Sequence, residues 1–326
     1  MYKNILITGG CGFIGANFIH FLYSQNYNGN IINVDKLTYA SNLANLHTLK
    51  DKTNYYFYKQ DICNYEDIES IFIKHNIDCI IHFAAESHVD RSIYGPKDFI
   101  LTNILGTFNL LEICRKQWKS YNNVRFHHIS TDEVYGSLDS EGYFYENTPY
   151  APRSPYSASK ASSDHLVSAY FNTYGLPITI SNCSNNYGLY QHSEKLIPQI
   201  ILNIKNKKPL PVYGDGRNIR DWIWVGDHCS AIYKILQSSK IGESYNIGGE
   251  NEMENIELVK KICKLMDEAL PGNKKHENLI TFVEDRPGHD RRYAVNCDKI
   301  KKELNWRPEV DFDLGLRKTI EWYISI

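Results

Sequence analysis

The stretch "TGGCGFIG", Thr8–Gly15, decides the fold of this 326-residue chain. It follows the short apolar run "NILI" and opens "FIGANFIHFLYSQ", in which apolar residues recur at helical spacing. In such a strand–turn–helix unit, Gly9 permits the tight turn, Gly12 lets the backbone approach a pyrophosphate, and Gly15 lets the helix pack on the strand. The helix N-terminus then offers free N–H groups to the phosphates. The stretch predicts a dinucleotide site, against the alternative of a glycine-rich turn that only caps a helix.

An acid follows at the spacing that such a site requires. Asp35 stands twenty residues after Gly15, at the end of the strand pattern "NIINVD". Its carboxylate can accept hydrogen bonds from both ribose hydroxyls and would repel a 2′-phosphate, so it favours NAD over NADP. The neighbouring Lys36 weakens this preference, and the alternative is that Asp35 is a surface turn residue. Further along, "KQDI" places Asp61 near the adenine, and "HFAAES" ends a strand pattern with small residues that let a cofactor lie against the backbone.

The rest of the chain repeats the alternation of strand and helix patterns. This indicates an α/β fold: a doubly wound parallel Rossmann-type sheet with a smaller mixed α/β substrate-binding domain. We expect an NAD-binding domain over residues 1–182, with a segment at about 219–240 that returns to it, and a nucleotide-sugar-binding domain over 183–326. The first strand pattern ends at the glycine turn, and five more lie at 30–35, 54–61, 78–85, 123–131 and 177–184. The clearest helix patterns lie at 99–118, 155–174, 254–268 and 313–325.

Composition excludes several classes of function. A net charge of -2 argues against general binding to nucleic acid or anionic membranes, and no apolar run approaches the roughly 18 residues of a membrane helix. The N-terminal "MYKNILITGG" enters a strand pattern without a signal peptide. The eight cysteines contain no CxxC pair, so we expect reduced thiols, no metal site and a cytoplasmic location.

A phenol and an amine share one face of the helix expected at 155–174. Ser154 can cap its start and Gly175 can end it. Tyr156 and Lys160 are an i,i+4 pair near its N-terminus. The phenol has an ordinary pKa of about 10, and a nearby ammonium together with the nicotinamide charge favours phenolate. Tyr156 can then take a proton from a carbinol while hydride leaves its carbon, and Lys160 can hold the nicotinamide ribose. The alternative is a packed tyrosine and a solvated lysine.

Two acids stand together at the end of the strand pattern "NVRFHHIST". Thr131, Asp132 and Glu133 are consecutive, and a plain alcohol oxidation needs only the threonine hydroxyl, Tyr156 and NAD. Two further carboxylates suggest a second event with its own acid and base, such as loss of water beside a ketone. Close carboxylates in a buried site take opposite protonation states, as that event requires. Alternatively, one of these acids only caps a turn, and the sequence does not choose which acid has which role.

The motifs "TGGCGFIG", "HFAAESHVDRS", "SPYSASK", "NNYGLYQHSEKLIP", "VYGDGRNIRDWIWVGDH", "YNIGG" and "DRPGHDRRYAV" together resemble the extended short-chain dehydrogenase/reductases that act on nucleotide sugars. The resemblance covers nearly the whole chain. It implies that Glu133 is the base at C5, Asp132 the acid at C6, and Thr131 the donor to the C4 hydroxyl. It also implies a homodimer that forms through a helix bundle, with the helices at 97–118 and 155–174 as candidates.

The resemblance assigns the remaining site positions residue by residue. The catalytic set is Thr131, Asp132, Glu133, Tyr156 and Lys160. The cofactor set is Gly9, Gly12, Phe13, Ile14, Gly15, Asp35, Lys36, Thr38, Asp61, Ile62, Phe83, Ala84, Ala85, Ser87, Thr102, Tyr156 and Lys160. The substrate set is Ser87, Thr131, Asn185, Lys195, Leu196, Pro211, Tyr213, Arg220, Asn255, Arg286 and His289. Cations that suit a diphosphate are Lys195, Arg220, Arg286, Arg291 and Arg292.

The expected reaction is therefore the NAD-dependent dehydration of dTDP-glucose: oxidation at C4, loss of water across C5 and C6, and return of hydride to C6. The alternatives are a UDP-sugar 4-epimerase, which needs no acid pair, a 4,6-dehydratase for another nucleotide sugar, and a non-catalytic NAD-binding protein. The product would lead to rhamnose or another deoxysugar. Positions that depart from the family's usual residues, and bear on the base and sugar, are Ser41, Asn182, Gly226, Ser230, Met253 and Glu254.

Overall fold

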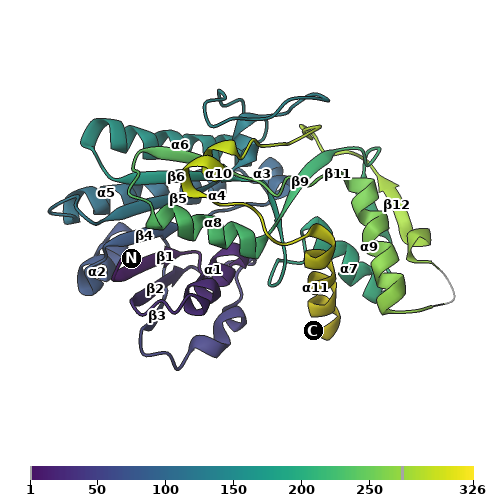
Figure 1. Ribbon diagram of the computed structural model, residues 1–326, viewed down its shortest axis with the longest axis horizontal. Coiled ribbons are helices and arrows are strands. Elements are labelled where there is room, and N and C mark those ends of the chain that lie inside the picture. Colours follow the sequence, from purple (N-terminus) through teal and green to yellow (C-terminus); the bar gives the residue numbers. More distant parts are fainter. Residues whose placement is uncertain (1, 273–274) are drawn as a thin grey trace.

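The computed structural model describes residues 2–272 and 275–326, and its larger part is built on one parallel sheet (Figure 1). Every neighbouring pair of strands in this sheet is parallel, and their order is β10-β6-β5-β4-β1-β2-β3. The strand order reverses direction beside β1, which creates the crevice where ligands bind in doubly wound sheets. The strands are β1 (Asn4–Thr8), β2 (Asn30–Asp35), β3 (Tyr55–Lys59), β4 (Cys79–His82), β5 (Arg125–Thr131), β6 (Ile178–Cys183) and β10 (Glu243–Ile247).

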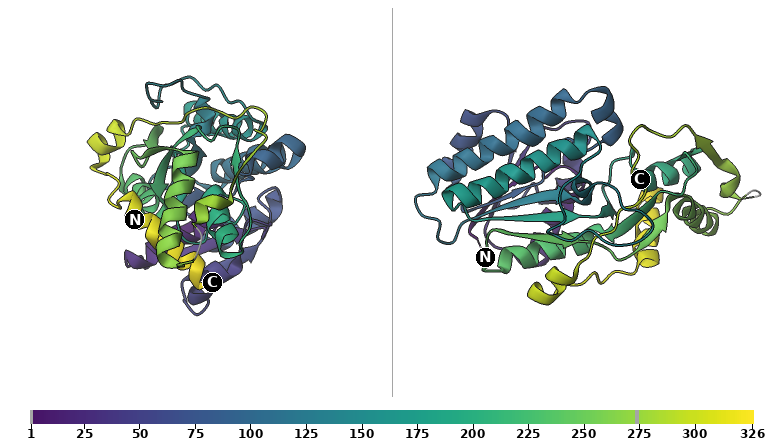
Figure 2. Two further views of the ribbon diagram at one scale, coloured as in Figure 1. Left: turned by 90° about the vertical axis from the view of Figure 1, so that its right-hand side faces the viewer. Right: turned by 90° about the horizontal axis from the view of Figure 1, so that it is seen from above.

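Helices cover both faces of the sheet because its strands are apolar on both sides. Along β1, Leu6 packs toward α2, α5 and α6, whereas Ile5 and Ile7 pack toward α1 and α8. Figure 2 shows the long helix α6 running beside the α5 segment over one face. The helices are α1 (Phe13–Ser24), α2 (Tyr65–His75), α5 (Thr107–Gln117), α6 (Pro155–Tyr174) and α8 (Val225–Gln237). This confirms the doubly wound parallel architecture expected from the sequence.

The helix expected at 99–118 is not a regular α-helix throughout. The segment begins with α4 (Lys97–Phe99), continues as the π-helical η2 (Ile100–Gly106), and becomes α-helical only in α5. Asn103 lies in this wide turn. Its side chain accepts a hydrogen bond from the Glu86 N–H and donates to the Glu86 carbonyl and the Ser159 hydroxyl. Such π-helical turns occur often near functional sites. Apolar periodicity does not mark the change, because apolar residues recur through both segments, although Ile100, Leu101 and Leu105 of η2 are exposed.

The smaller part of the chain packs around its own apolar core (Figure 1, right). It has a three-stranded sheet of order β11-β9-β7 and a two-stranded sheet of β12 and β8. Its elements are β7 (Asn185–Tyr187), β8 (Leu210–Tyr213), β9 (Ile219–Trp224), β11 (Glu252–Glu254), β12 (Ile280–Val283), α7 (Leu196–Lys205), α9 (Asn255–Ala269) and α11 (Phe312–Ser325). The remaining short elements are η1 (Leu43–Leu49), α3 (Val89–Tyr94), η3 (Asp132–Tyr135), η4 (His276–Leu279) and α10 (Asp298–Leu304).

The segment expected to return to the large sheet at 219–240 does so only in part. Its helix, α8, packs on α1 against the sheet, but its strand, β9, pairs with β7 and β11 in the small sheet. The strand that joins the large sheet is β10, which pairs in parallel with β6. The edge beyond β6 is thus filled by a strand further along the chain, a choice that local patterns cannot reveal.

Candidate active site

The glycine loop lies where the large sheet reverses its strand order. Gly9 has φ +71°, and a side chain there would place Cβ 2.7 Å from the backbone nitrogen of Ala84. A Cβ on Gly15 would collide with the Gly9 carbonyl oxygen, so this glycine lets α1 pack against the strand. At Gly12 the nearest atom, the Gly9 oxygen, would be 3.3 Å away. Gly9 and Gly15 are therefore required by the chain itself, whereas the space at Gly12 is available to a ligand.

Asp35 is buried at the end of β2, with 4% of its surface exposed. Its Oδ2 accepts a hydrogen bond from the Cys11 N–H at 2.9 Å, and its Oδ1 accepts one from the Leu37 N–H at 2.8 Å. A carboxylate oxygen can accept more than one hydrogen bond, so both atoms keep capacity for ribose hydroxyls. Lys36 turns its amine toward Asp61 at 2.7 Å. That ion pair takes up the positive charge that would otherwise favour a 2′-phosphate.

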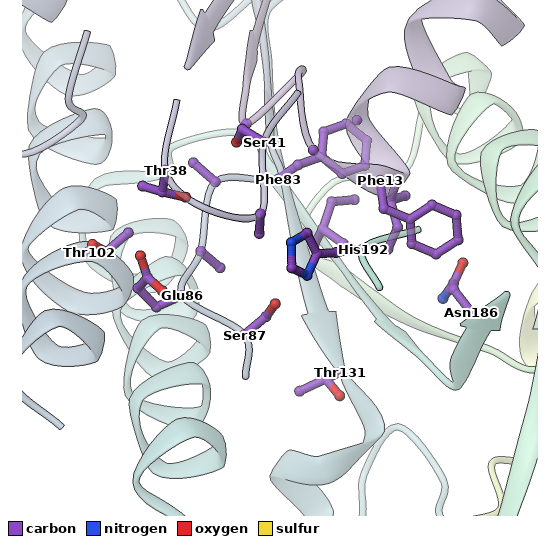
Figure 3. A pocket seen from close by; sticks show the side chains of 18 of the residues that line it. Phe13, Thr38, Ser41, Phe83, Glu86, Ser87, Thr102, Thr131, Asn186 and His192 are labelled. Atoms are coloured by element: carbon purple, nitrogen blue, oxygen red, sulfur yellow. The ribbon is translucent and has the colours of Figure 1, made fainter. Parts of the chain in front are cut away.

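One cavity of about 290 Å³ extends from the glycine loop along the carboxyl edge of the sheet. Figure 3 shows Phe13, Thr38 and Phe83 around one end of it and Thr131 at the other. Every residue predicted for the cofactor lines this cavity, and so do all five predicted catalytic residues. Residues that also line it, but were not predicted, are Val34, Ala40, Ser41, Gln60, Glu86, Ile129, Ser130, Cys183, Ser184, Asn186, Gln191, His192 and Glu194.

The acid pair stands where β5 changes into the short helix η3. Thr131 caps η3: its hydroxyl oxygen accepts from the Glu133 N–H at 3.3 Å, while its O–H donates to Asp132 Oδ1 at 3.2 Å. Asp132 is only 2% exposed, and its Oδ2 has no hydrogen-bond partner within the part of the chain that is described. Glu133 is partly buried. The cap holds the two side chains at the edge of the sheet, facing the cavity.

The surroundings of the two acids differ in charge. Burial raises the pKa of Asp132 well above its ordinary value, and the charge of Glu133 raises it further. Burial also raises the pKa of Glu133, but the positive charges of Arg286, Arg220 and Lys195 oppose that rise. These surroundings favour a proton on Asp132 over one on Glu133. This is the order of roles that an acid at C6 and a base at C5 require.

Tyr156 and Lys160 lie in the first turns of α6, whose start is fixed by a reciprocal cap between Ser154 and Ser157. Both are buried, at 8% and 4% exposure. Burial, then the charge of Glu133, raises the pKa of Tyr156 well above its ordinary value. That Lys160 and the nicotinamide charge together favour the phenolate stays a prediction, because the chain alone carries no cofactor charge and the lysine amine contacts other groups here. Its Nζ donates to the Ile129 carbonyl at 2.8 Å and lies 3.2 Å from His128 Nε2.

The predicted substrate residues fall into two groups. Ser87, Thr131, Asn185 and Lys195 line the cavity, and the Lys195 amine donates to the Ser87 carbonyl at 2.9 Å. The others stand in the smaller part of the chain and do not line this cavity: Leu196, Pro211, Tyr213, Arg220, Asn255, Arg286 and His289.

Several of these outer residues have partners of their own. Asp90, from α3, accepts a hydrogen bond from the Tyr213 hydroxyl at 3.3 Å and pairs with Arg286 at 3.5 Å. Arg220 donates to the Asp290 carbonyl at 2.9 Å. His289 pairs with Asp285 at 2.6 Å. Asp90 thus links the large sheet's side of the molecule to two residues predicted to hold substrate.

Two of the five cations proposed for a diphosphate are paired with acids of the chain. Arg292 makes a bidentate pair with Glu252, at 2.6 and 2.9 Å. Arg291 pairs with Asp215 at the surface, at 3.1 Å. Their roles are structural, which leaves Lys195, Arg220 and Arg286 as the cations near the acid pair.

Comparisons with known proteins agree with this geometry. The family model described as GDP-mannose 4,6 dehydratase matches residues 6–319. A curated dTDP-glucose 4,6-dehydratase of Haemophilus influenzae is 53% identical, over 98% of each chain. The chain belongs to the dTDP-glucose 4,6-dehydratase family.

Two solved structures of this family superpose on the whole chain. The dTDP-glucose 4,6-dehydratase of Bacillus anthracis, in complex with NAD, has a TM-score of 0.89 at 46% identity and covers 99% of this chain and 97% of its own. The dTDP-glucose 4,6-dehydratase of Streptomyces venezuelae, also with NAD bound, has a TM-score of 0.91 at 42% identity with the same coverage. The described helices contain none long and apolar enough to cross a membrane.

Positions that depart from the usual residues of such dehydratases and epimerases have local roles here. The Asn182 amide donates to the Thr131 carbonyl at 3.3 Å and to Asp164 at 3.4 Å. The Ser230 hydroxyl accepts from the Trp306 indole at 2.8 Å. Ser41 lines the cavity.

Some residues of the site were missed from sequence although signals for them existed. His128 lies within the stretch that carries the acid pair, and Asp164 is four residues after Lys160 on the same helix face. Glu86 and His192 line the cavity, yet they stand in loops whose course no local pattern predicts (Figure 3).

Proposed function

We propose that this chain converts dTDP-glucose into dTDP-4-keto-6-deoxyglucose, with NAD as its cofactor. The observation that carries the proposal is the acid pair, which shares one cavity with Tyr156 and Lys160. Hydride chemistry alone explains the tyrosine and lysine, and only elimination of water requires Asp132 and Glu133 as well. The names of relatives at 53% identity support the same substrate.

The residues at the glycine loop fit NAD. The loop and the N-terminus of α1 would hold the pyrophosphate, Asp35 the adenosine ribose, and Lys160 the nicotinamide ribose. Phe83, together with the small side chains that follow it, would lie against the cofactor. When bound, NAD would accept the hydride that leaves C4, and its reduced form would give that hydride to C6.

The chain's own residues then move protons. Tyr156 takes the proton of the C4 hydroxyl, and Thr131 donates a hydrogen bond to the oxygen at C4. The C4 ketone acidifies the proton at C5, which the Glu133 carboxylate removes. Asp132, kept protonated by burial and by the charge of Glu133, gives its proton to the departing C6 hydroxyl, which leaves as water. As hydride returns to C6, Glu133 gives the proton that it removed back to C5.

The nucleotide would lie across the outer residues of the cleft. Lys195, Arg220 and Arg286 are suited to the two phosphates, because they supply positive charge around the acid pair. Pro211 and Tyr213 would border the base. The other substrate positions proposed here are Ser87, Asn185, Leu196, Asn255 and His289.

A substrate panel tests the proposal. The purified chain is incubated with dTDP-glucose, UDP-glucose and GDP-mannose, and the 4-keto product is detected by its absorbance in alkali. We expect product from dTDP-glucose with no net change in NAD. Formation of the galactose epimer without a 4-keto product would instead assign the chain to the 4-epimerases, and NAD binding with no turnover of any sugar nucleotide would make it non-catalytic.

We also propose that two copies associate through the helices beside the cavity. On η2 and α5, the apolar side chains of Ile100, Leu101, Leu105 and Phe108 are 38 to 48% exposed. An exposed apolar face of this kind is typical of an interface. The test is the mass in solution: we expect a dimer for the native chain and a monomer for Phe108→Glu, and a monomeric native chain contradicts the proposal.

We propose the cytoplasm as the location of the chain. All eight cysteines are free thiols and seven are buried, as suits a reducing compartment.

We also propose that the chain divides into two domains. The NAD-binding domain comprises residues 1–182 with α8 and β10, and the nucleotide-sugar-binding domain comprises the rest of 183–326. Limited proteolysis tests the division, since we expect cuts to fall first in loops of the second domain.

A further inference from the structure

Three ionisable side chains are buried together at the wall of the cavity, and the proposed mechanism uses only Lys160, the one that lines it. Lys160, His128 and Asp164 are 4%, 0% and 1% exposed. Burying a charge without a partner is costly, so a cluster of this kind needs its charges matched. How the three groups divide their protons decides the state of the Lys160 amine.

Among the described residues, the Lys160 amine contacts a backbone carbonyl and an imidazole. It donates to the Ile129 carbonyl at 2.8 Å, and it lies 3.2 Å from His128 Nε2. The same ring nitrogen lies 3.1 Å from the Ser163 hydroxyl oxygen, and Nδ1 has no hydrogen-bond partner among the described residues. Burial and the charge of Lys160 also lower the pKa of His128 well below its ordinary value, in agreement with a neutral ring.

Asp164 supplies the negative charge of the cluster from the next turn of α6. Its Oδ1 lies 3.2 Å from His128 Nε2, the same atom that faces the lysine. Its Oδ2 accepts hydrogen bonds from the Ser130 hydroxyl at 2.6 Å and from the Tyr150 hydroxyl at 3.0 Å. These donors stabilise the carboxylate form, although burial raises its pKa to about 6.

The charges of Asp164 and Lys160 influence each other across the imidazole. Burial lowers the pKa of the Lys160 amine, and the charge of Asp164 opposes that effect. Within the described residues, Asp164 is the carboxylate that contacts a partner of this lysine, since the acid pair lies on the cavity side. Without it, the buried amine would face only a carbonyl and a neutral ring.

We infer that Asp164 and His128 are positioning residues: the carboxylate keeps the Lys160 amine charged, and the ring fixes where that charge points. The inference deepens the proposed function, on which it rests, because Lys160 holds the nicotinamide ribose and supports the Tyr156 phenolate there. Neither Asp164 nor His128 lines the cavity, so they act through the lysine and not on the substrate.

The first experiment is a double-mutant cycle with Asp164→Asn and Lys160→Met. We expect Asp164→Asn alone to lower kcat by about 10- to 100-fold, as misplacement of a reacting group does, with little change in KM for dTDP-glucose. It should also weaken NAD binding, measured by calorimetry without substrate. In the Lys160→Met background the same substitution should change the NAD Kd by less than about twofold, because its target is gone.

Tyr150→Phe is the matched control for the cycle. It deletes one hydrogen bond to Asp164 and leaves the carboxylate and the other donors in place. We expect it to keep kcat and the NAD Kd within about threefold of wild type, since the Ser130 and Asn182 donors still hold the carboxylate.

A second pair of variants keeps the inference testable if Asp164→Asn does not fold. His128→Gln retains an acceptor that can reach the lysine amine, whereas His128→Leu removes it. We expect the glutamine variant to keep most of the kcat and the leucine variant to lose as much as Asp164→Asn.

Three results would overturn the inference. These are an Asp164→Asn enzyme within about twofold of wild type in both readouts, an equal loss of NAD affinity in the Lys160→Met background, and equal impairment of the two His128 variants. If the wild-type chain turns over no sugar nucleotide, the proposed function fails instead, and the NAD Kd values still judge the role of Asp164.

Discussion

The two sides of the cleft hold their polar groups in different ways. On the side of the large sheet, Asp35 is fixed by two backbone N–H groups and Thr131 by the cap of η3. On the opposite side, Arg286 and Tyr213 both contact Asp90, a carboxylate from across the cleft. The first side is held by backbone groups and a helix cap, whereas the second is held by the Asp90 carboxylate, for which we expect a diphosphate to compete.

The largest effect is expected at the acid pair. Glu133→Gln should lower product formation by about 10³-fold, because the base at C5 is lost. Oxidation at C4 should still occur, so reduced nicotinamide should accumulate on the enzyme, which absorbance spectroscopy detects. Tyr156→Phe should lose the earlier step and accumulate none. As a control, the exposed Glu141→Gln should match wild type, and wild-type turnover by Glu133→Gln would show that another residue is the base.

On the other side of the cleft, Arg286→Ala should raise KM for dTDP-glucose by about 10- to 100-fold, the value of one or two charge-assisted hydrogen bonds. Steady-state kinetics measures this. Arg291→Ala is the matched control, because that guanidinium pairs with Asp215 at the surface, and its KM should stay near wild type. Equal effects of the two substitutions would mean that Arg286 does not meet the phosphates.

The dependence of kcat/KM on pH should reveal the raised pKa of Glu133. The base acts as a carboxylate, and burial raises its pKa, so it takes up a proton at a higher pH than an ordinary glutamate. Activity should therefore fall on the acid side already above the usual carboxylate range, by about tenfold per pH unit. In Arg286→Ala this fall should begin at a still higher pH, since the arginine opposes the rise. An unshifted profile in that variant contradicts the assignment.

The smallest effect is expected from neutralising Asp90, the carboxylate that contacts Arg286 and Tyr213. Asp90→Asn frees Arg286 and Tyr213 from a competing charge, so dTDP should bind about two- to fivefold more tightly, the range for a partly exposed ion pair. Calorimetry with dTDP measures the change. Weaker binding in this variant would mean that Asp90 assists the ligand and does not compete with it.

The sequence by itself determined the features that depend on local chemistry. The glycine loop, the acid at the end of β2, the six strand patterns and the cap at Ser154 all follow from spacing, periodicity and side-chain hydrogen bonding within a few residues. The same holds for the place of the acid pair at the end of β5.

Only the tertiary structure decided what depends on partners far apart in the chain. It placed β10 at the edge of the large sheet, paired Arg291 and Arg292 with acids of their own, and brought the Lys160 amine against His128. The cations that oppose the rise in the pKa of Glu133 come from the smaller part of the chain, so their effect on the acid pair also depends on the tertiary structure. Electrostatic energies depend on the distance between charges and on their burial, and the spacing of residues along a sequence specifies neither of these.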